Sequence, residues 1–129
     1  FLISLIFLVN FLANKFYWYY SVWYLDMIMH FLGGFWVSLL VLYMHPLAKK
    51  SFPEILKVLF VVLIVGIGWE IFEIAVNDVI AQNPFDLLDT GSDIFFDLAG
   101  GALSILYFLK RIMLQSKDSP LGNPLKDCP

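Results

Sequence analysis

Three apolar runs, each long enough to cross a bilayer, constrain this chain more than any other feature. They extend from Val22 to Met44, from Ile55 to about Ile80 and from about Ser92 to Leu109. A helix needs about 20 residues to cross roughly 30 Å of hydrocarbon. The composition agrees, because 60% of the residues are hydrophobic and 15% are charged, whereas an ordinary soluble domain has about 25% charged residues. The sequence therefore predicts a polytopic membrane protein and excludes a soluble globular domain.

A fourth apolar run, from Phe1 to about Ala13, is shorter, and we interpret it as a truncated or processed span. The alternative is the core of a signal peptide, but the run has neither a basic segment before it nor an A-x-A-like cleavage site after it. Aromatic residues at positions 16–24 follow it and favour a membrane–water interface. The expected fold class is all-α, with a four-helix transmembrane bundle over residues 1–111 and a polar cytoplasmic tail over residues 112–129.

Basic residues predict the orientation in the membrane, because they are retained on the cytoplasmic side. Lys49, Lys50 and Lys57 flank one connection, and Lys110 and Arg111 follow the last span. Two crossings separate these groups, so they share a face, and four helices place both termini in the cytoplasm. We expect a protein of the bacterial inner membrane. The net charge of −3 offers no basic surface to nucleic acid.

Acidic side chains inside the predicted spans are the feature that points to function. Each costs about 2.5–3.5 kcal/mol on insertion scales, so their presence needs a reason. The seven candidate metal ligands are Asp26, His30, Glu70, Glu73, Asp89, Asp93 and Asp97. Counted from the predicted outer helix ends at about 1.5 Å per residue, those inside the spans lie at similar depths, roughly 6–15 Å below the outer surface.

The candidates also share helix faces, because they are three or four residues apart within each helix. The sets are Asp26 and His30, Glu70 and Glu73, and Asp89, Asp93 and Asp97. Each stripe continues into small residues: Gly33, Gly34 and Ser38, then Gly66, and then Gly100, Gly101 and Ser104. Small residues let membrane helices pack closely. We therefore predict one buried acidic cluster near the outer face, sealed by glycine contacts on its cytoplasmic side.

Three interpretations of this cluster stay open at the level of the residues. So many carboxylates cannot all remain ionised and unpaired in a low dielectric, and no Lys or Arg shares their level. A divalent cation among them is the leading interpretation, since oxygen ligands with one imidazole suit Mg²⁺, Ca²⁺, Mn²⁺ or a carboxylate-rich Zn²⁺ or Fe²⁺ site. The alternatives are a protonated hydrogen-bond network that locks the helices, and a cation or proton pathway or the recognition of a cationic or hydroxylated substrate.

The same motifs resemble those of the VanZ-like family of small bacterial membrane proteins, over roughly residues 22–108. Asp26 to Phe31 is similar to the family's Asp-x-x-x-His-Phe. Glu70 to Glu73 is similar to its Glu-x-x-Gln, with Glu in place of Gln, and Asp93 to Gly100 to its Asp-x-x-x-Asn-x-x-Gly, with Asp in place of Asn. These departures make the site more acidic, which favours a metal over a neutral polar pocket.

The resemblance and the residues together give a functional hypothesis. The protein would be a VanZ-like membrane protein that binds a divalent cation and acts on an envelope lipid or isoprenoid-linked carrier, with Glu73 as general base. The lipid bilayer would be its first partner. In the alternative, it is an accessory subunit of a larger membrane complex, and the acidic cluster only locks helix packing. A pathway is disfavoured, because few polar residues lie on the cytoplasmic side of the cluster.

Overall fold

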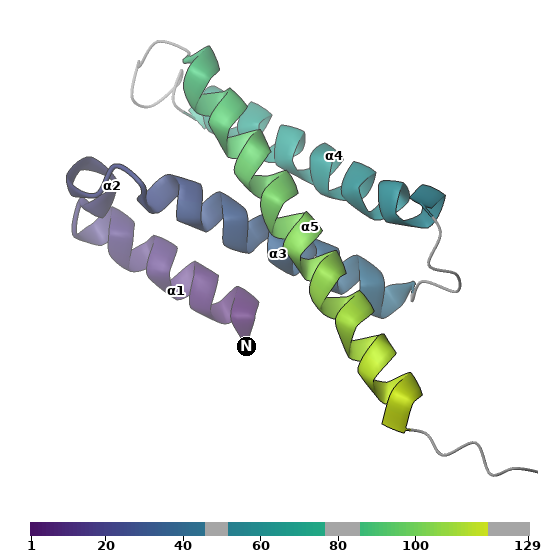
Figure 1. Cartoon of the computed structure of the whole chain (residues 1–129). Helices are drawn as coiled ribbons and strands as arrows, with labels where there is room; N and C mark the ends of the chain where they lie inside the picture. The colour runs from purple at the N-terminus through teal and green to yellow at the C-terminus, as the bar shows by residue number, and fades with distance from the viewer. Residues whose placement is uncertain (46–51, 77–85, 119–129) are drawn as a thin grey trace, which may run out of the picture.

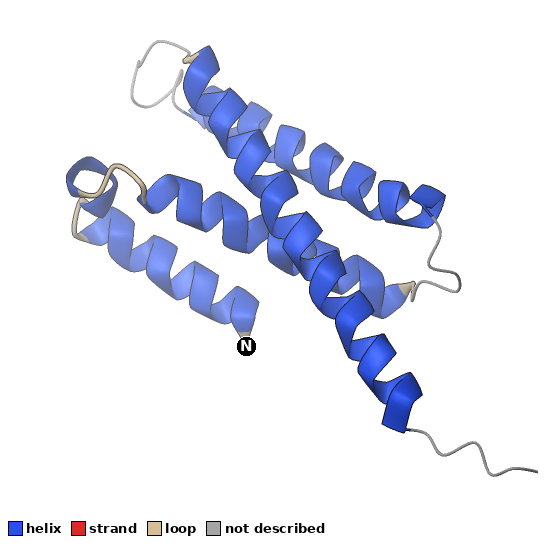
Figure 2. Cartoon of the chain, viewed as in Figure 1, coloured by secondary structure: helices blue, strands red, loops and turns tan. Residues whose placement is uncertain are grey.

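A computed structural model describes residues 1–45, 52–76 and 86–118, and the elements in these ranges are all α-helices (Figure 1 and Figure 2). In chain order they are α1 (Leu2–Lys15), α2 (Trp18–Ser21), α3 (Leu25–Met44), α4 (Phe52–Val76) and α5 (Leu87–Asp118). Three helical segments are long and apolar enough to cross a membrane: α3, α4 and Leu87–Arg111 of α5. The predicted all-α membrane bundle is thereby confirmed.

The first helix differs from the three long ones in its length and in the helices that it contacts. α1 has 14 residues, which cover roughly 21 Å at about 1.5 Å per residue. The chain then turns through Tyr17, whose φ of 55° lies in the left-handed region. Within the described ranges α1 packs on α3 and α2 and contacts neither α4 nor α5 (Figure 1). The core that positions the cluster is therefore the α3–α4–α5 bundle.

Glycine residues make the crossing between α3 and α5, which pass diagonally over each other (Figure 1). A Cβ atom on Gly34 would collide with the backbone carbonyl of Asp97, and one on Gly100 would collide with the backbone carbonyl of Phe31. Each helix thus places a glycine where the backbone of the other approaches. This is the close packing of small residues that the sequence predicted.

Buried positions repeat every four residues along α3 and α4, as expected for one face of a helix. The buried residues are His30, Gly34, Ser38 and Leu42 on α3, and Val58, Val62, Gly66 and Glu70 on α4. Because the two helices run in opposite directions (Figure 1), the polar ends of both stripes meet at one end of the bundle. At the other end, Leu42 and Val58 pack with Ile105 of α5 in an apolar core.

The last helix is longer at both ends than the sequence predicted. It begins at Leu87, ahead of Ser92, because the Asp86 carboxylate accepts a hydrogen bond of 2.9 Å from the backbone N–H of Leu88 and caps the first turn. It also continues past Arg111 to Asp118. Basic residues do not end a helix, and neither Gly nor Pro occurs at 112–118. The beginning of the predicted tail is therefore helical, whereas residues 119–129 lie outside the described ranges.

Parts of the topology argument lie outside the described residues. The apolar run that begins at Ile55 was expected to reach about Ile80, and the description of α4 ends at Val76. Lys49 and Lys50 also lie outside the described ranges. Lys57 is exposed and pairs with Glu54 at 2.8 Å. The predicted orientation in the membrane therefore stays a prediction.

Candidate metal centre

His30 lies at the centre of a buried polar cluster that three helices build together. Its Nδ1 atom is 3.4 Å from Asp97 Oδ2 on α5. Its Nε2 atom is 3.9 Å from Asp26 Oδ1, one turn earlier on α3, and 3.8 Å from Glu70 Oε1 on α4. His30 and Glu70 are each 5% exposed. The three polar stripes thus converge on one imidazole ring, as their spacing predicted.

Two overlapping groups of ligand atoms share this ring. One consists of Asp26, His30 and Asp93 and the other of His30, Glu70 and Glu73, and within each group the atoms lie no more than 4.8 Å apart. Ligand atoms held about 2.1 Å from one ion are separated by about 3 Å when adjacent and about 4.2 Å when opposite. The distances of 3.8 and 3.9 Å from His30 Nε2 fall in this range. The cluster is therefore close to the size of a site for one ion.

Glu70 has a carboxylate oxygen that stays unsatisfied within the described part of the chain. Oε1 is buried and has no hydrogen-bond partner among the described residues. The atom faces His30 Nε2 at 3.8 Å, which is too long for a hydrogen bond. Burying an acceptor without a partner costs about 1–3 kcal/mol, and more when the group is charged. A cation held between these two atoms would satisfy both of them.

Asp97 occupies a different position, inside the helix crossing. Its Oδ2 atom would be 2.5 Å from a Cβ on Gly66 of α4, and its Oδ1 atom 3.9 Å from a Cβ on Gly33 of α3. Its backbone carbonyl is the group that lies against Gly34. The Asp97 side chain is therefore confined between the backbones of two helices, and it has little room to turn.

Six of the seven predicted residues come together and one does not. The six are Asp26, His30, Glu70, Glu73, Asp93 and Asp97. Asp89 is exposed and belongs to neither group of ligand atoms. The early start of α5 places it in the first turn of that helix. Asp26 and Glu73 are half-buried, so they mark the side from which the cluster is accessible.

Tyr19 on α2 lies beside these accessible acids, and the sequence assigned it only to the membrane interface. Its hydroxyl donates a hydrogen bond of 2.8 Å to Asn10 Oδ1, and Asn14 Nδ2 donates one of 3.0 Å to the same oxygen. Burial, together with the charges of Asp26 and Glu73, raises the pKa of Tyr19 to about 12. The signal that could have found this network is a pair of asparagines, four residues apart, within an apolar helix.

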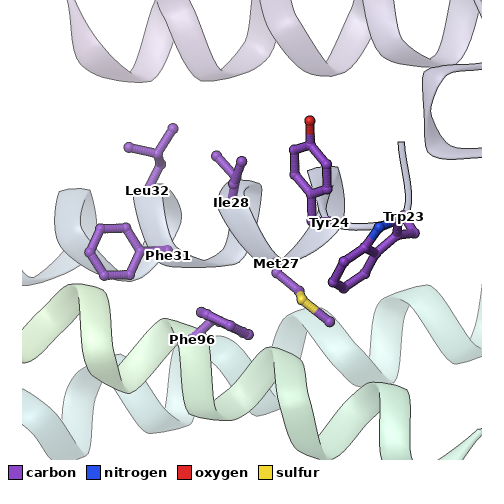
Figure 3. Close-up of a pocket in the computed structure, with 7 residues that line it drawn as sticks. All are labelled: Trp23, Tyr24, Met27, Ile28, Phe31, Leu32 and Phe96. Atoms are coloured by element: carbon purple, nitrogen blue, oxygen red, sulfur yellow. The ribbon is translucent and has the colours of Figure 1, made fainter. Parts of the chain in front are cut away.

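An apolar groove of about 350 Å³ runs along a neighbouring face of α3 (Figure 3). Six of its lining residues lie between Trp23 and Leu32, and Phe96 comes from α5. Figure 3 shows Phe31 and Phe96 close together on the side of α3 that faces α5. Met27 in the groove directly follows Asp26 in the cluster. The groove and the acidic cluster therefore occupy adjacent faces of the same helix.

Comparison with known proteins supports the membrane assignment. Residues 1–113 match the model of a family described as "Predicted membrane protein (DUF2238)". The match extends over all three candidate spans as far as Arg111 and over every residue of the cluster. No curated protein and no solved structure matches the chain.

Proposed function

We propose that this chain, which belongs to the DUF2238 family of predicted membrane proteins, works through a divalent cation held between α3, α4 and α5. The proposed ligands are His30, Asp26, Glu70, Glu73 and Asp93. The observation that carries this proposal is the buried Oε1 atom of Glu70, which lacks a hydrogen-bond partner and faces the imidazole of His30. Asp89, which is exposed and belongs to neither group of ligand atoms, is left out of this ligand set.

The donor set suits a hard or borderline ion such as Mg²⁺, Mn²⁺ or Zn²⁺, because it combines several carboxylates with one imidazole. A bound divalent ion supplies Lewis acidity toward a phosphate, carbonyl or water oxygen. The protein's own groups bind and orient the reactants. Glu73 is half-buried on the accessible side of the cluster, which supports its proposed role as general base in a form of the site where the other four ligands hold the ion.

The scaffold alternative accounts for the helix crossing better than for the cluster. Ser38 Oγ donates a buried hydrogen bond of 3.1 Å to the backbone carbonyl of Gly101, so part of the polar stripe does hold α3 against α5. A network that only locked helices would be expected to satisfy its buried acceptors. Glu70 Oε1 is not satisfied, and this difference favours the cation.

The pathway alternative has less support. Beyond the glycine crossing, the core of the described residues consists of Leu42, Val58 and Ile105, with Ser38 and Ser104 as the buried polar groups nearest to the crossing. An ion or proton would have to cross this apolar layer to leave at the far end. The arrangement supports a site that opens toward one end of the bundle.

We propose a membrane lipid with a phosphate-bearing head as the substrate class. The apolar groove supports this, since it lies on the face of α3 next to the cluster. Its lining consists of apolar and aromatic side chains, among them Phe31 and Phe96. A hydrocarbon chain in the groove would bring its head near Asp26. The proposed test is copurified lipid: Phe96→Ala should lower the amount of bound phospholipid, and unchanged lipid content would contradict this part of the proposal.

Metal content of the purified full chain is the experiment that tests the cation. We expect the wild type, stripped of metal and reloaded with Mn²⁺ or Zn²⁺, to bind one ion per chain. Glu70→Gln should weaken binding at least about 10-fold, because it removes a charged ligand. Glu54→Gln is the matched control, since Glu54 pairs with Lys57 away from the cluster, and it should bind as the wild type does. A wild type without stoichiometric metal would contradict the proposal.

A further inference from the structure

We infer that Asp97 is a positioning residue and not a ligand of the cation: its carboxylate holds the His30 ring so that Nε2 faces the ligand carboxylates. The inference rests on the proposed function, because it assigns separate roles within that same site. It divides the acidic residues, which the sequence treated as equivalent, into those that bind the ion and one that orients the imidazole.

The first step of the argument concerns the two nitrogens of the ring. An ionised carboxylate only accepts hydrogen bonds, so the nitrogen that faces it carries the proton. His30 Nδ1 lies 3.4 Å from Asp97 Oδ2, and we assign the proton to Nδ1, which then donates to this carboxylate. In a neutral imidazole this leaves a lone pair on Nε2, the nitrogen that faces Asp26 and Glu70 at 3.9 and 3.8 Å. Three electron-rich atoms then point at one another, which is the arrangement that a cation stabilises.

The second step concerns where Asp97 lies. It belongs to neither of the two groups of ligand atoms, although both groups contain His30. Its oxygens are enclosed by the backbones at Gly66 and Gly33, on the Nδ1 side of the ring. The backbone carbonyl of Asp97 lies against Gly34, so the helix contact fixes the point at which this side chain leaves α5. Histidine ligands commonly donate their second N–H to a carboxylate, which fixes the ring and raises the basicity of the ligating nitrogen.

The third step concerns Gly66, which makes room for the positioning carboxylate. A Cβ at Gly66 would lie 2.5 Å from Asp97 Oδ2, so alanine there must displace that oxygen. Gly68 is on the same helix, and a Cβ there would have nothing within 4 Å. Gly66→Ala and Gly68→Ala therefore form a matched pair that changes the position of Asp97 in one case and not in the other. Neither substitution touches a ligand atom.

Nitrogen NMR of the full chain with ¹⁵N-labelled histidine tests the inference, because the chain contains two histidines, His30 and His45. In the wild type we expect Zn²⁺ to shift Nε2 of His30 and to leave Nδ1 protonated. Asp97→Asn and Gly66→Ala should each weaken Zn²⁺ binding about 10–100-fold and move the Nδ1–H signal. Gly68→Ala should change neither the affinity nor the signal.

Asp26→Asn provides the contrast with a ligand. It should weaken Zn²⁺ binding and leave the Nδ1–H signal of the metal-free protein in place. Zn²⁺ on Nδ1 in the wild type would overturn the inference, and so would wild-type affinity and an unmoved Nδ1–H signal in both Asp97→Asn and Gly66→Ala. If Asp97→Asn does not fold, Gly66→Ala and the wild-type spectrum decide the question. A wild type that binds no Zn²⁺ overturns the proposed function itself.

Discussion

The two halves of the α3–α4–α5 bundle share one four-residue spacing of buried positions but differ in the kind of side chain found there. In the half where α3 begins and α4 ends, the four-residue stripes carry His30 and Glu70. In the other half the same stripes carry Leu42 and Val58, which pack as an apolar core. The glycine crossing separates the halves. The comparison teaches that helix contacts are concentrated in the crossing and the apolar half, whereas the charged half gathers groups that a ligand could bind.

This division matters because lipid gives packed helices little hydrophobic advantage over separated ones. Close backbone contact and interhelical hydrogen bonds supply the attraction instead. The contacts at Gly34 and Gly100, with the hydrogen bond from Ser38, provide both at the crossing. The buried acids add a cost of about 2.5–3.5 kcal/mol each on insertion scales, which a bound cation would offset.

The largest expected effect comes from substitutions at the glycine crossing, which separates the charged half from the apolar half. Gly34→Ala or Gly100→Ala would place a methyl group against a backbone carbonyl of the facing helix, which cannot rotate away. We expect a loss of about 3 kcal/mol in unfolding free energy, the upper part of the usual range for overpacking. Reversible unfolding in mixed micelles measures it. Gly68→Ala is the control and should be neutral or stabilising by up to about 1 kcal/mol; equal losses in all three variants would argue against the crossing.

A second prediction concerns the charged half alone. Zn²⁺ or Mn²⁺ at 100 times its dissociation constant should raise the unfolding free energy by about 2.7 kcal/mol. The gain should vanish as the pH falls, because protons compete with the cation for carboxylate and imidazole ligands. Melting curves with and without metal, from neutral to acidic pH, test this. Glu70→Gln should show little gain at the same metal concentration, and a gain as large as that of the wild type would contradict the assignment.

Much of this arrangement follows from the sequence because one spacing rule governs it. Residues three or four apart share a helix face, so Asp26 with His30 and Glu70 with Glu73 already predict polar stripes. The separate role that we propose for Asp97 was not predictable in this way. It depends on the angle at which α5 crosses α3, and that angle is set by backbone contacts at glycines. The exposure of Asp89 likewise depends on where α5 begins, which the capping carboxylate of Asp86 sets. The sequence offers several acids near this end of the helix and does not show which of them is the cap.

A third and smaller effect is expected where α2 borders the charged half. Tyr19→Phe removes the hydrogen bond to Asn10 and should lower the unfolding free energy by about 1 kcal/mol. Because the pKa of Tyr19 is raised to about 12, the folded state retains a proton that an unfolded tyrosine releases near pH 10. Stability should therefore fall as the pH rises from about 10 to 12, with tyrosinate absorbance as the measurement. The exposed Tyr24 provides the control, Tyr24→Phe, which should leave this pH dependence unchanged.

The smallest effect compares two buried serines on facing helices. Ser38→Ala removes the hydrogen bond to Gly101 and should cost about 0.6 kcal/mol, the average for such bonds between membrane helices. Ser104 Oγ is buried and has no hydrogen-bond partner within the ranges that the structure describes, so Ser104→Ala should be neutral or slightly stabilising. Unfolding in mixed micelles would separate the two. A larger loss in unfolding free energy for Ser104→Ala than for Ser38→Ala would contradict the roles given to these two serines.

The length of α5 has a mechanical consequence. Its 32 residues form a rod of about 48 Å at 1.5 Å per residue, whereas the hydrocarbon layer is about 30 Å thick. The glycine crossing at Asp97 and Gly100 lies ahead of the middle of the rod, so it acts as a fulcrum with a shorter arm on the side of the cluster and a longer arm that reaches beyond Arg111. Any tilt that accompanies ligand binding is magnified along the long arm. A fluorophore attached near residue 118 would therefore report a tilt of α5 that starts at the cluster.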